Sequence, residues 1–176
     1  MRTTLDTPIG RLTLLGSDDG ELEAVLFANE PYTGDEPDDP IAMADARAAF
    51  ERYFAGDTDA FADVALRFDG TPFQRAVWTA LTELPFGRTT TYGELASSLS
   101  LRPGDHPTSA RAVGSANART PIPIVMACHR VIGGTGALTG YRGGLAVKRA
   151  LLAFESSGGD PGALGEALAE ADYELV

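Results

Sequence analysis

The sequence contains few of the residues that disulfide bonds and structural zinc sites require. Its 176 residues include one cysteine and two histidines, so it cannot form an internal disulfide and has too few ligands for a Cys/His zinc site. It also has no apolar run approaching the roughly 18 residues of a membrane-spanning helix. The opening residues, MRTTLDTPIG, contain no apolar stretch of the kind found in secretory signals. These absences predict a cytoplasmic protein in a reducing compartment.

Basic residues are scarce and unevenly distributed. The net charge is −11, but residues 71–155 hold 9 basic and 4 acidic residues, whereas residues 1–70 hold 5 and 16. Residues 156–176 add five acids and no base. A basic segment within an acidic chain is what a nucleic-acid-binding face would produce. Thirteen of the 14 basic residues are arginine, which suits bidentate phosphate contacts. A GC-rich genome would explain the excess of arginine over lysine equally well. It would not explain why the excess of positive charge is confined to residues 71–155.

The first half of the chain predicts a small sheet followed by a helix. Residues 3–27 alternate between apolar and polar side chains around the turn sequence SDDG, as in a β-hairpin or meander. Residues 41–55 have helical spacing, and Gly56 is positioned to end the helix. A short apolar piece, VALRF, ends this half. With 44% hydrophobic and 22% charged residues, the chain has the composition of a globular protein.

The second half predicts several short helices. The first begins at Pro72 with Thr71 as its N-cap and ends before Pro85. TTYGELASSL and SARAVGSANA form a pair that fits a helix-turn-helix, although many helix pairs in protein cores share this pattern. PIPIVMACHRVIG predicts a buried extended segment, followed by a glycine-rich loop and a helix ending at Glu155. One loose helix is expected around residues 163–171.

One cluster of residues has the composition of a nucleophilic site. Cys128 follows an apolar segment and precedes His129 and Arg130, whose charges would lower the pKa of the thiol. Neighbours on a regular strand face opposite sides, so His129 can act on Cys128 only if the backbone turns or a water bridges them. Glu155 borders an apolar helix face at a C-terminus, where an acid needs a partner such as histidine. A structural cysteine beside a surface histidine is the alternative interpretation.

Several motifs together resemble one family. TPFQRAVWTALTELPFGRTTTYGELA, ARAVGSAN, PIPIV, CHRVIG and GYRGGLAVKRALLAFE follow in this order across residues 71–155. This region strongly resembles the O6-alkylguanine-DNA alkyltransferases, and TPIGRLTLLGSDDG resembles the start of their N-terminal domain more loosely. The resemblance implies an α/β fold. It consists of a ribonuclease-H-like domain with an antiparallel sheet (residues 1–69) and a mostly helical winged-helix-type domain with a helix-turn-helix (residues 70–156). The acidic C-terminal tail that follows (residues 157–176) has no counterpart in this resemblance.

The resemblance also implies a chemistry. Such a protein repairs double-stranded DNA once per molecule, without a cofactor, by moving an alkyl group from guanine O6 to Cys128; O4-alkylthymine is a further candidate substrate. His129, acting through a water, removes the thiol proton, and Glu155 orients and charges that histidine. Tyr92 contacts the flipped base or its phosphate and helps to protonate the departing guanine.

The remaining roles concern DNA and the base pocket. The resemblance implies a monomer that binds the minor groove through its helix-turn-helix, with Arg111 filling the space left by the flipped base. Further implied DNA contacts are Ala112, Arg119 and Thr120. The implied residues of the base pocket are Val131, Tyr141, Arg142 and Gly143.

Two departures from the family pattern lie close to the nucleophile. Ala127 stands where the family normally has proline, and Thr120 where it usually has asparagine. Both changes are expected to loosen the local backbone and slow the transfer. The connection from Tyr92 to Arg111 also looks longer than usual. A lesion-binding protein with weak or no transfer is therefore the first alternative, and a helix-turn-helix regulator with an incidental cysteine is the second.

Overall fold

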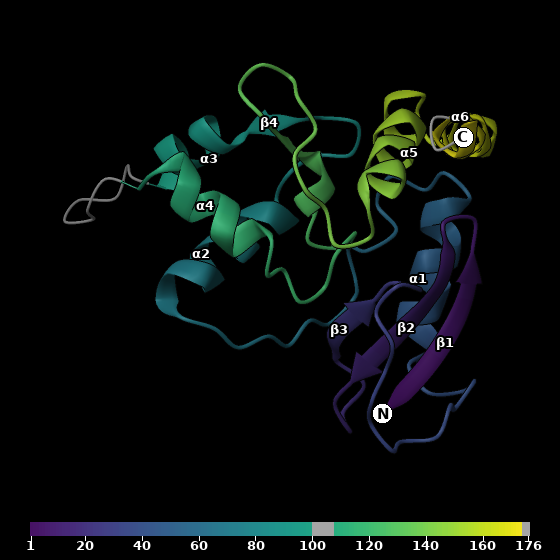
Figure 1. Ribbon diagram of the computed structural model, residues 1–176. Coiled ribbons are helices and arrows are strands. Elements are labelled where there is room, and N and C mark those ends of the chain that lie inside the picture. The colour runs from purple at the N-terminus through teal and green to yellow at the C-terminus, as the bar shows by residue number, and fades with distance from the viewer. Residues whose placement is uncertain (100–107, 174–176) are drawn as a thin grey trace.

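The structure, a computed structural model, describes residues 1–99 and 108–173. In Figure 1, the strands of the N-terminal half lie at one side of the molecule, and short helices of the second half lie at the other. Residues 100–107, within the longer connection expected between Tyr92 and Arg111, fall outside the described residues. No helix in the described part of the chain is long and apolar enough to cross a membrane.

The N-terminal half forms the predicted meander. Strands β1 (Arg2–Thr7), β2 (Gly10–Gly16) and β3 (Leu22–Leu26) pair antiparallel in the order β1-β2-β3. Alternate side chains point to one face because strand side chains have a period of two. That face contributes Leu5, Leu12, Leu14, Leu22 and Val25 to the core.

Helix α1 (Ala44–Phe54) contributes the apolar stripe expected from its spacing, with Ala46, Ala49, Phe50, Tyr53 and Phe54 buried. The chain turns away at Gly56, whose φ of 99° favours glycine over other residues. Residues 58–63 form turns, and the VALRF piece contributes one isolated bridge, between Leu66 and Leu22.

The second half begins with the predicted helices. Helix α2 (Pro72–Thr82) has a capping box formed by Thr71 and Gln74. Strand β4 (Thr90–Thr91) leads into α3 (Tyr92–Leu99), and Thr91 and Glu94 cap this helix reciprocally. Helix α4 (Ala110–Asn117) packs against α2 and α3. This arrangement agrees with the predicted helix-turn-helix pair.

The segment predicted to be extended is not a strand. Residues 121–127 form a turning loop, in which Ile124 has the rare positive φ of 76°, and Cys128–Arg130 form a turn of 3₁₀-helix (η1). Pro121 and Pro123 have no backbone N–H and cannot donate to a sheet ladder. Only β5 (Val131–Ile132) is extended, and it pairs parallel with β4. The prediction of a long extended segment was wrong, and the turn needed between Cys128 and His129 is present.

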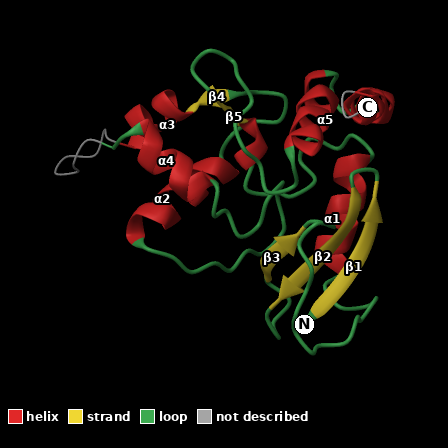
Figure 2. Cartoon of the chain, viewed as in Figure 1, coloured by secondary structure: helices red, strands yellow, loops and turns green. Residues whose placement is uncertain are grey.

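Two helices complete the chain. Helix α5 (Leu145–Ser156) is followed by α6 (Pro161–Tyr173), and the two lie side by side (Figure 2). Leu164 of α6 is fully buried, and the backbone of Gly159 touches that of Gly56 so closely that a Cβ on either would lie 2.7 Å from the other. The expected loose helix is therefore packed against the rest of the protein.

Candidate active site

A cavity of about 910 Å³ lies between α3, α4 and the glycine-rich loop of residues 133–144. Of the residues predicted from the sequence, it is lined by Tyr92, Arg111, Cys128, Tyr141 and Arg142. The fold thus brings together side chains that lie up to 50 positions apart in the sequence.

Two predicted pocket residues do not line this cavity. Val131 is fully buried, and its carbonyl accepts a hydrogen bond from Lys148 Nζ at 2.7 Å. Gly143 faces the N-terminal domain, where an added Cβ would lie 2.9 Å from the Phe27 ring. Neither residue is among those that line the cavity, contrary to the prediction.

Cys128 begins the 3₁₀ turn and is almost completely buried, with 4% of its surface exposed. Burial raises the pKa of the thiol because a thiolate loses its hydration. The Thr120 hydroxyl, the Ile124 amide and the charges of Lys148 and Arg142 act in the opposite direction but do not outweigh burial. The resting protein therefore carries a thiol. The prediction of a lowered pKa failed because burial dominates.

Glu155, near the end of α5, is the most heavily hydrogen-bonded side chain of the site. It accepts from His129 Nε2, from Arg130 Nε and Nη2, from Tyr53 Oη and from the Gly87 amide, at 2.7–3.2 Å. Burial alone would raise the pKa of this carboxyl, but the bonds and charges of His129 and Arg130 outweigh burial and hold it far below its usual range. Glu155 is therefore a buried carboxylate.

His129 is neutral and has one free ring nitrogen. Burial lowers the pKa of its imidazole, and the positive charges of Arg130 and Lys148 lower it further, against the opposing effect of Glu155. A neutral ring that donates from Nε2 to Glu155 carries a lone pair on Nδ1. This Nδ1 is buried without a hydrogen-bond partner among the described residues. Glu155 thus orients His129 and sets its tautomer. The resting imidazole is neutral, whereas the resemblance implied that Glu155 charges it.

Two tyrosines lie on the walls of the cavity. The Tyr92 hydroxyl, from α3, is 2.8 Å from Thr139 Oγ1 on the glycine-rich loop. The Tyr141 hydroxyl is buried next to the Cys128 thiol and has no hydrogen-bond partner in the part of the chain that the structure describes. Burial raises the pKa of Tyr141 well above its ordinary value. Its phenol therefore stays protonated and can donate.

Arg142 joins the cavity to the N-terminal domain. Its Nε donates to Glu30 Oε1 at 2.8 Å, and its Nη1 donates to the Thr120 carbonyl. Both members of the ion pair are about one-quarter exposed.

Thr120 does not lie where DNA could reach it. Its side chain is fully buried, and its hydroxyl donates to the Asn117 carbonyl at 2.7 Å. Asn117 Nδ2 in turn donates to the Cys128 carbonyl at 3.4 Å. The predicted DNA contact is corrected to a buried joint between α4 and the nucleophile.

The other predicted DNA contacts lie on α4 or just after it. Arg111 is exposed in its first turn and lines the cavity. The Ala112 amide is already used, because it donates to the N-cap Ser109 Oγ at 3.1 Å. Arg119 is exposed just beyond the helix.

Sequence reasoning missed three residues of the site, namely Tyr53, Asn117 and Lys148. Asn117 and Lys148 could have been found, because each is a polar side chain on a helix face that the spacing predicts to be buried. Tyr53 gave no such signal, since its partner Glu155 becomes its neighbour only in the folded chain. Arg130 was expected to act on the thiol of Cys128, whereas the structure pairs it with Glu155.

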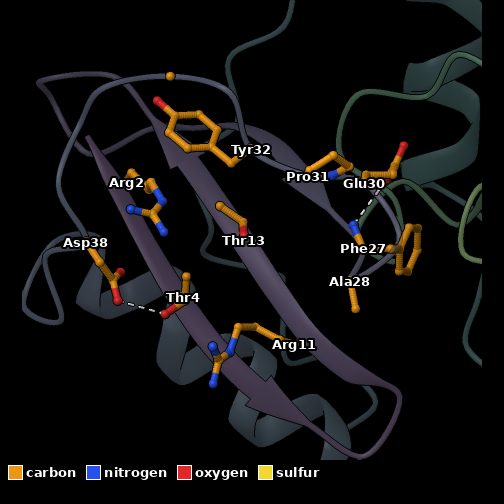
Figure 3. Close-up of a pocket in the computed structure, with 11 residues that line it drawn as sticks. Arg2, Thr4, Arg11, Thr13, Phe27, Ala28, Glu30, Pro31, Tyr32 and Asp38 are labelled. Atoms are coloured by element: carbon orange, nitrogen blue, oxygen red, sulfur yellow. Dashed lines mark hydrogen bonds between the residues drawn. The ribbon is translucent and has the colours of Figure 1, made fainter.

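A second cavity, of about 460 Å³, lies over the N-terminal sheet (Figure 3). Arg2 lies under the Tyr32 ring, 5.1 Å from its centroid, and Thr4 donates to Asp38 at 2.8 Å. The residues lining it include no cysteine or histidine. We therefore place the candidate chemistry in the larger cavity, which contains Cys128.

Comparisons with known proteins point to one family. A family model described as "6-O-methylguanine DNA methyltransferase, DNA binding domain" matches residues 72–157, and one described as "6-O-methylguanine DNA methyltransferase, ribonuclease-like domain" matches residues 1–68. A methylated-DNA–protein-cysteine methyltransferase from Mycolicibacterium paratuberculosis is 46% identical over 154 residues, covering 86% of this chain and 90% of the relative. One from Methanosarcina acetivorans is 43% identical, covering 86% and 96%.

A solved structure is similar over nearly the whole chain. The crystal structure of Mycobacterium tuberculosis OGT in complex with DNA has a TM-score of 0.80 and 41% identity, and it covers 93% of this chain and 98% of its own.

Proposed function

The chain belongs to the 6-O-methylguanine DNA methyltransferase family, and we propose that it repairs DNA by moving the alkyl group from guanine O6 to its own Cys128. The observation that carries this assignment is the position of Cys128 in the 910 Å³ cavity, next in sequence to a neutral His129 that Glu155 holds by Nε2. The product is a thioether, so each molecule acts once as a methylated-DNA–[protein]-cysteine S-methyltransferase.

The transfer requires a proton to leave the sulfur and another to reach the base. The thiol proton passes, through a bridging water, to the free Nδ1 of His129, because Nε2 is committed to Glu155. The sulfur then attacks the alkyl carbon in line with O6, so that the S–C bond forms as the C–O6 bond breaks. The bonding pair stays with guanine, which takes a proton from the Tyr92 hydroxyl. Solvent restores that proton, and Tyr141 donates a hydrogen bond beside the sulfur.

The base must leave the double helix to reach Cys128, because the thiol lies inside the cavity. In our proposal α4 enters the minor groove and Arg111, exposed at its first turn, occupies the space of the flipped base. Flipping costs a few kcal/mol, which pocket contacts and the inserted side chain offset. We propose that the protein acts as a monomer, as the family resemblance implies.

A second candidate function is lesion binding without efficient transfer. The burial of Cys128, which raises the pKa of its thiol, favours it, as does Thr120 at a position where the family usually has asparagine. Intact-protein mass spectrometry after incubation with an O6-methylguanine duplex distinguishes the two. We expect one added methyl group on wild type and none on Cys128→Ala, with DNA binding retained. Lesion-selective binding without a mass change would support the second function instead.

A further inference from the structure

The N-terminal domain contributes one group directly to the active site. Tyr53, on α1, donates its hydroxyl to Glu155 Oε1 at 2.7 Å, although the two residues are 102 positions apart. Both side chains are buried, with 1% and 3% of their surfaces exposed. Among the described donors to Glu155, Tyr53 is the one that comes from residues 1–69; the others come from the second half of the chain.

The Tyr53 ring is held firmly in place. It packs against Phe54, Phe61, Phe86 and Phe154, with ring centroids 5.1–5.9 Å apart. Phe86 and Phe154 directly precede Gly87 and Glu155, which are themselves members of the hydrogen-bond cluster. Because these rings fix the tyrosine, its hydroxyl has little freedom to point elsewhere. Replacement by phenylalanine would keep this packing and remove only the hydroxyl.

Tyr53 and His129 share one oxygen atom. Glu155 Oε1 accepts from Tyr53 Oη, His129 Nε2 and Arg130 Nη2 at 2.7–2.8 Å. An ionised carboxylate has about four lone-pair sites over its two oxygens, so three donors at one oxygen constrain each other. The orientation of the carboxylate, and the charge that it presents to His129, therefore depend on the Tyr53 hydroxyl. Burial raises the pKa of Tyr53 well above its ordinary value, so this hydroxyl remains a donor.

We propose that Tyr53 is a positioning residue of the active site, whose hydroxyl holds the Glu155 carboxylate so that His129 keeps its Nε2–H tautomer and presents a free Nδ1 to the Cys128 proton. The N-terminal domain thereby helps to set the reactivity of a nucleophile in the other domain. This inference rests on the proposed function only in its claim about the transfer rate. Its claim about His129 concerns the free protein and can be tested separately.

The expected direction of the pH effect follows from the charges around the imidazole. His129 interacts with Glu155, Arg130 and Lys148, and Tyr141 and Cys128 lie on its other side. Removing the Tyr53 hydroxyl leaves more negative charge on Oε1, which stabilises a protonated imidazole. The pKa of His129 should therefore rise, and the pH midpoint of the transfer rate should rise with it.

The experiment compares wild type with Tyr53→Phe in two measurements. Single-turnover transfer from a saturating O6-methylguanine duplex is followed across the pH range in which histidine titrates. The tautomer and titration of His129 are read from its imidazole ¹⁵N signals, assigned by comparison with His129→Gln. Hydrogen bonds to charged groups are among the stronger ones in proteins, so we expect Tyr53→Phe to slow transfer on the order of tenfold near neutral pH. We also expect an upward shift of both pH midpoints.

Two controls separate positioning from packing. Phe61→Leu disturbs the same aromatic cluster but keeps the hydroxyl, so it should lower the melting temperature without moving either midpoint. Tyr32→Phe removes a phenol from the same domain away from Glu155 and should change neither measurement. In Glu155→Gln, adding Tyr53→Phe should produce no further shift of the His129 signals.

The outcomes are distinct. Wild-type rate, pH midpoints and imidazole signals in Tyr53→Phe would overturn the proposal, and so would equal midpoint shifts in Phe61→Leu. If wild type transfers no methyl group, the proposed function fails, while the ¹⁵N signals of His129 still decide whether Tyr53 sets its tautomer.

Discussion

The backbone N–H of Ala127, the residue directly before the nucleophile Cys128, donates to the carbonyl of Leu81 near the end of α2, 3.2 Å away. Ala127 has a φ of −69°, within the range that proline imposes. The alanine therefore adopts the backbone angle of the residue it replaces and adds a tether to α2. The expected loosening of the backbone at this position is not found.

Restoring proline at this position should lower stability. Proline would suit the observed φ of residue 127, and this effect alone would raise the free energy of unfolding of Ala127→Pro by about 0.4–1 kcal/mol. It would also delete the N–H and leave the buried Leu81 carbonyl unpaired, at a cost of about 1–3 kcal/mol. We expect a net loss of about 1 kcal/mol in urea unfolding, with Ala127→Ser, which keeps the N–H, as the control. A gain in stability would show that the Leu81 bond contributes little.

Glu155→Gln should affect stability as strongly as catalysis. The amide cannot balance the buried Arg130 guanidinium, and breaking a buried ion pair from one side costs about 3–5 kcal/mol. Transfer should also slow, because an amide does not select the His129 tautomer as a carboxylate does. Chemical denaturation and single-turnover transfer measure the two effects. The control is Asp6→Asn, which breaks the exposed pair with Arg11 and should change neither. Unchanged stability in Glu155→Gln would contradict the buried network.

Stability should fall in mild acid because of His129. The pKa of its folded imidazole is lowered from 6.5, so the unfolded chain takes up a proton near that pH while the folded protein does not. Stability is then lost as pH drops through 6.5, by at most about 1.4 kcal/mol per pH unit for one group. The pKa of Glu155 is lowered from 4.5, so protonation of this carboxylate reduces stability further only below pH 4.5. The melting temperature of His129→Gln should depend less steeply on pH between these two values than that of wild type. A slope equal to that of wild type would refute the assignment.

Arg111 should matter more for base flipping than for affinity. We expect Arg111→Ala to slow transfer strongly with a modest loss of DNA affinity, because its side chain lines the cavity that receives the base. Arg119 is exposed just beyond α4 and does not line the cavity. Arg119→Ala should instead reduce the slope of log affinity against log salt concentration by about one. Arg67→Ala, in the N-terminal half, is the control for both. Fluorescence of a base analogue opposite the lesion measures flipping, and normal flipping with Arg111→Ala would remove this residue from that role.

Most of the local structure could be predicted from the sequence because its signals are short-range. Alternating leucines specify β1–β3, and Thr71 with Pro72 and Thr91 with Glu94 mark the starts of α2 and α3. Cys128, His129 and Glu155 stood out because each polar group interrupts an apolar pattern. The family resemblance, carried by contiguous motifs, led to the chemistry.

Only the tertiary structure decided how these groups are paired and charged. The left-handed Ile124 and the 3₁₀ turn arise where the chain must fold back between α4 and β5, which residue preferences alone do not specify. Burial, which depends on the whole packed core, raises the pKa of Cys128 against the effect expected from its neighbours in sequence. Burial also keeps His129 neutral, against the opposing effect of Glu155. Thr120 moved from the predicted DNA surface to the interior for the same reason. Tyr53 joined Glu155 because two domains meet there, and no pattern within either segment carries that information.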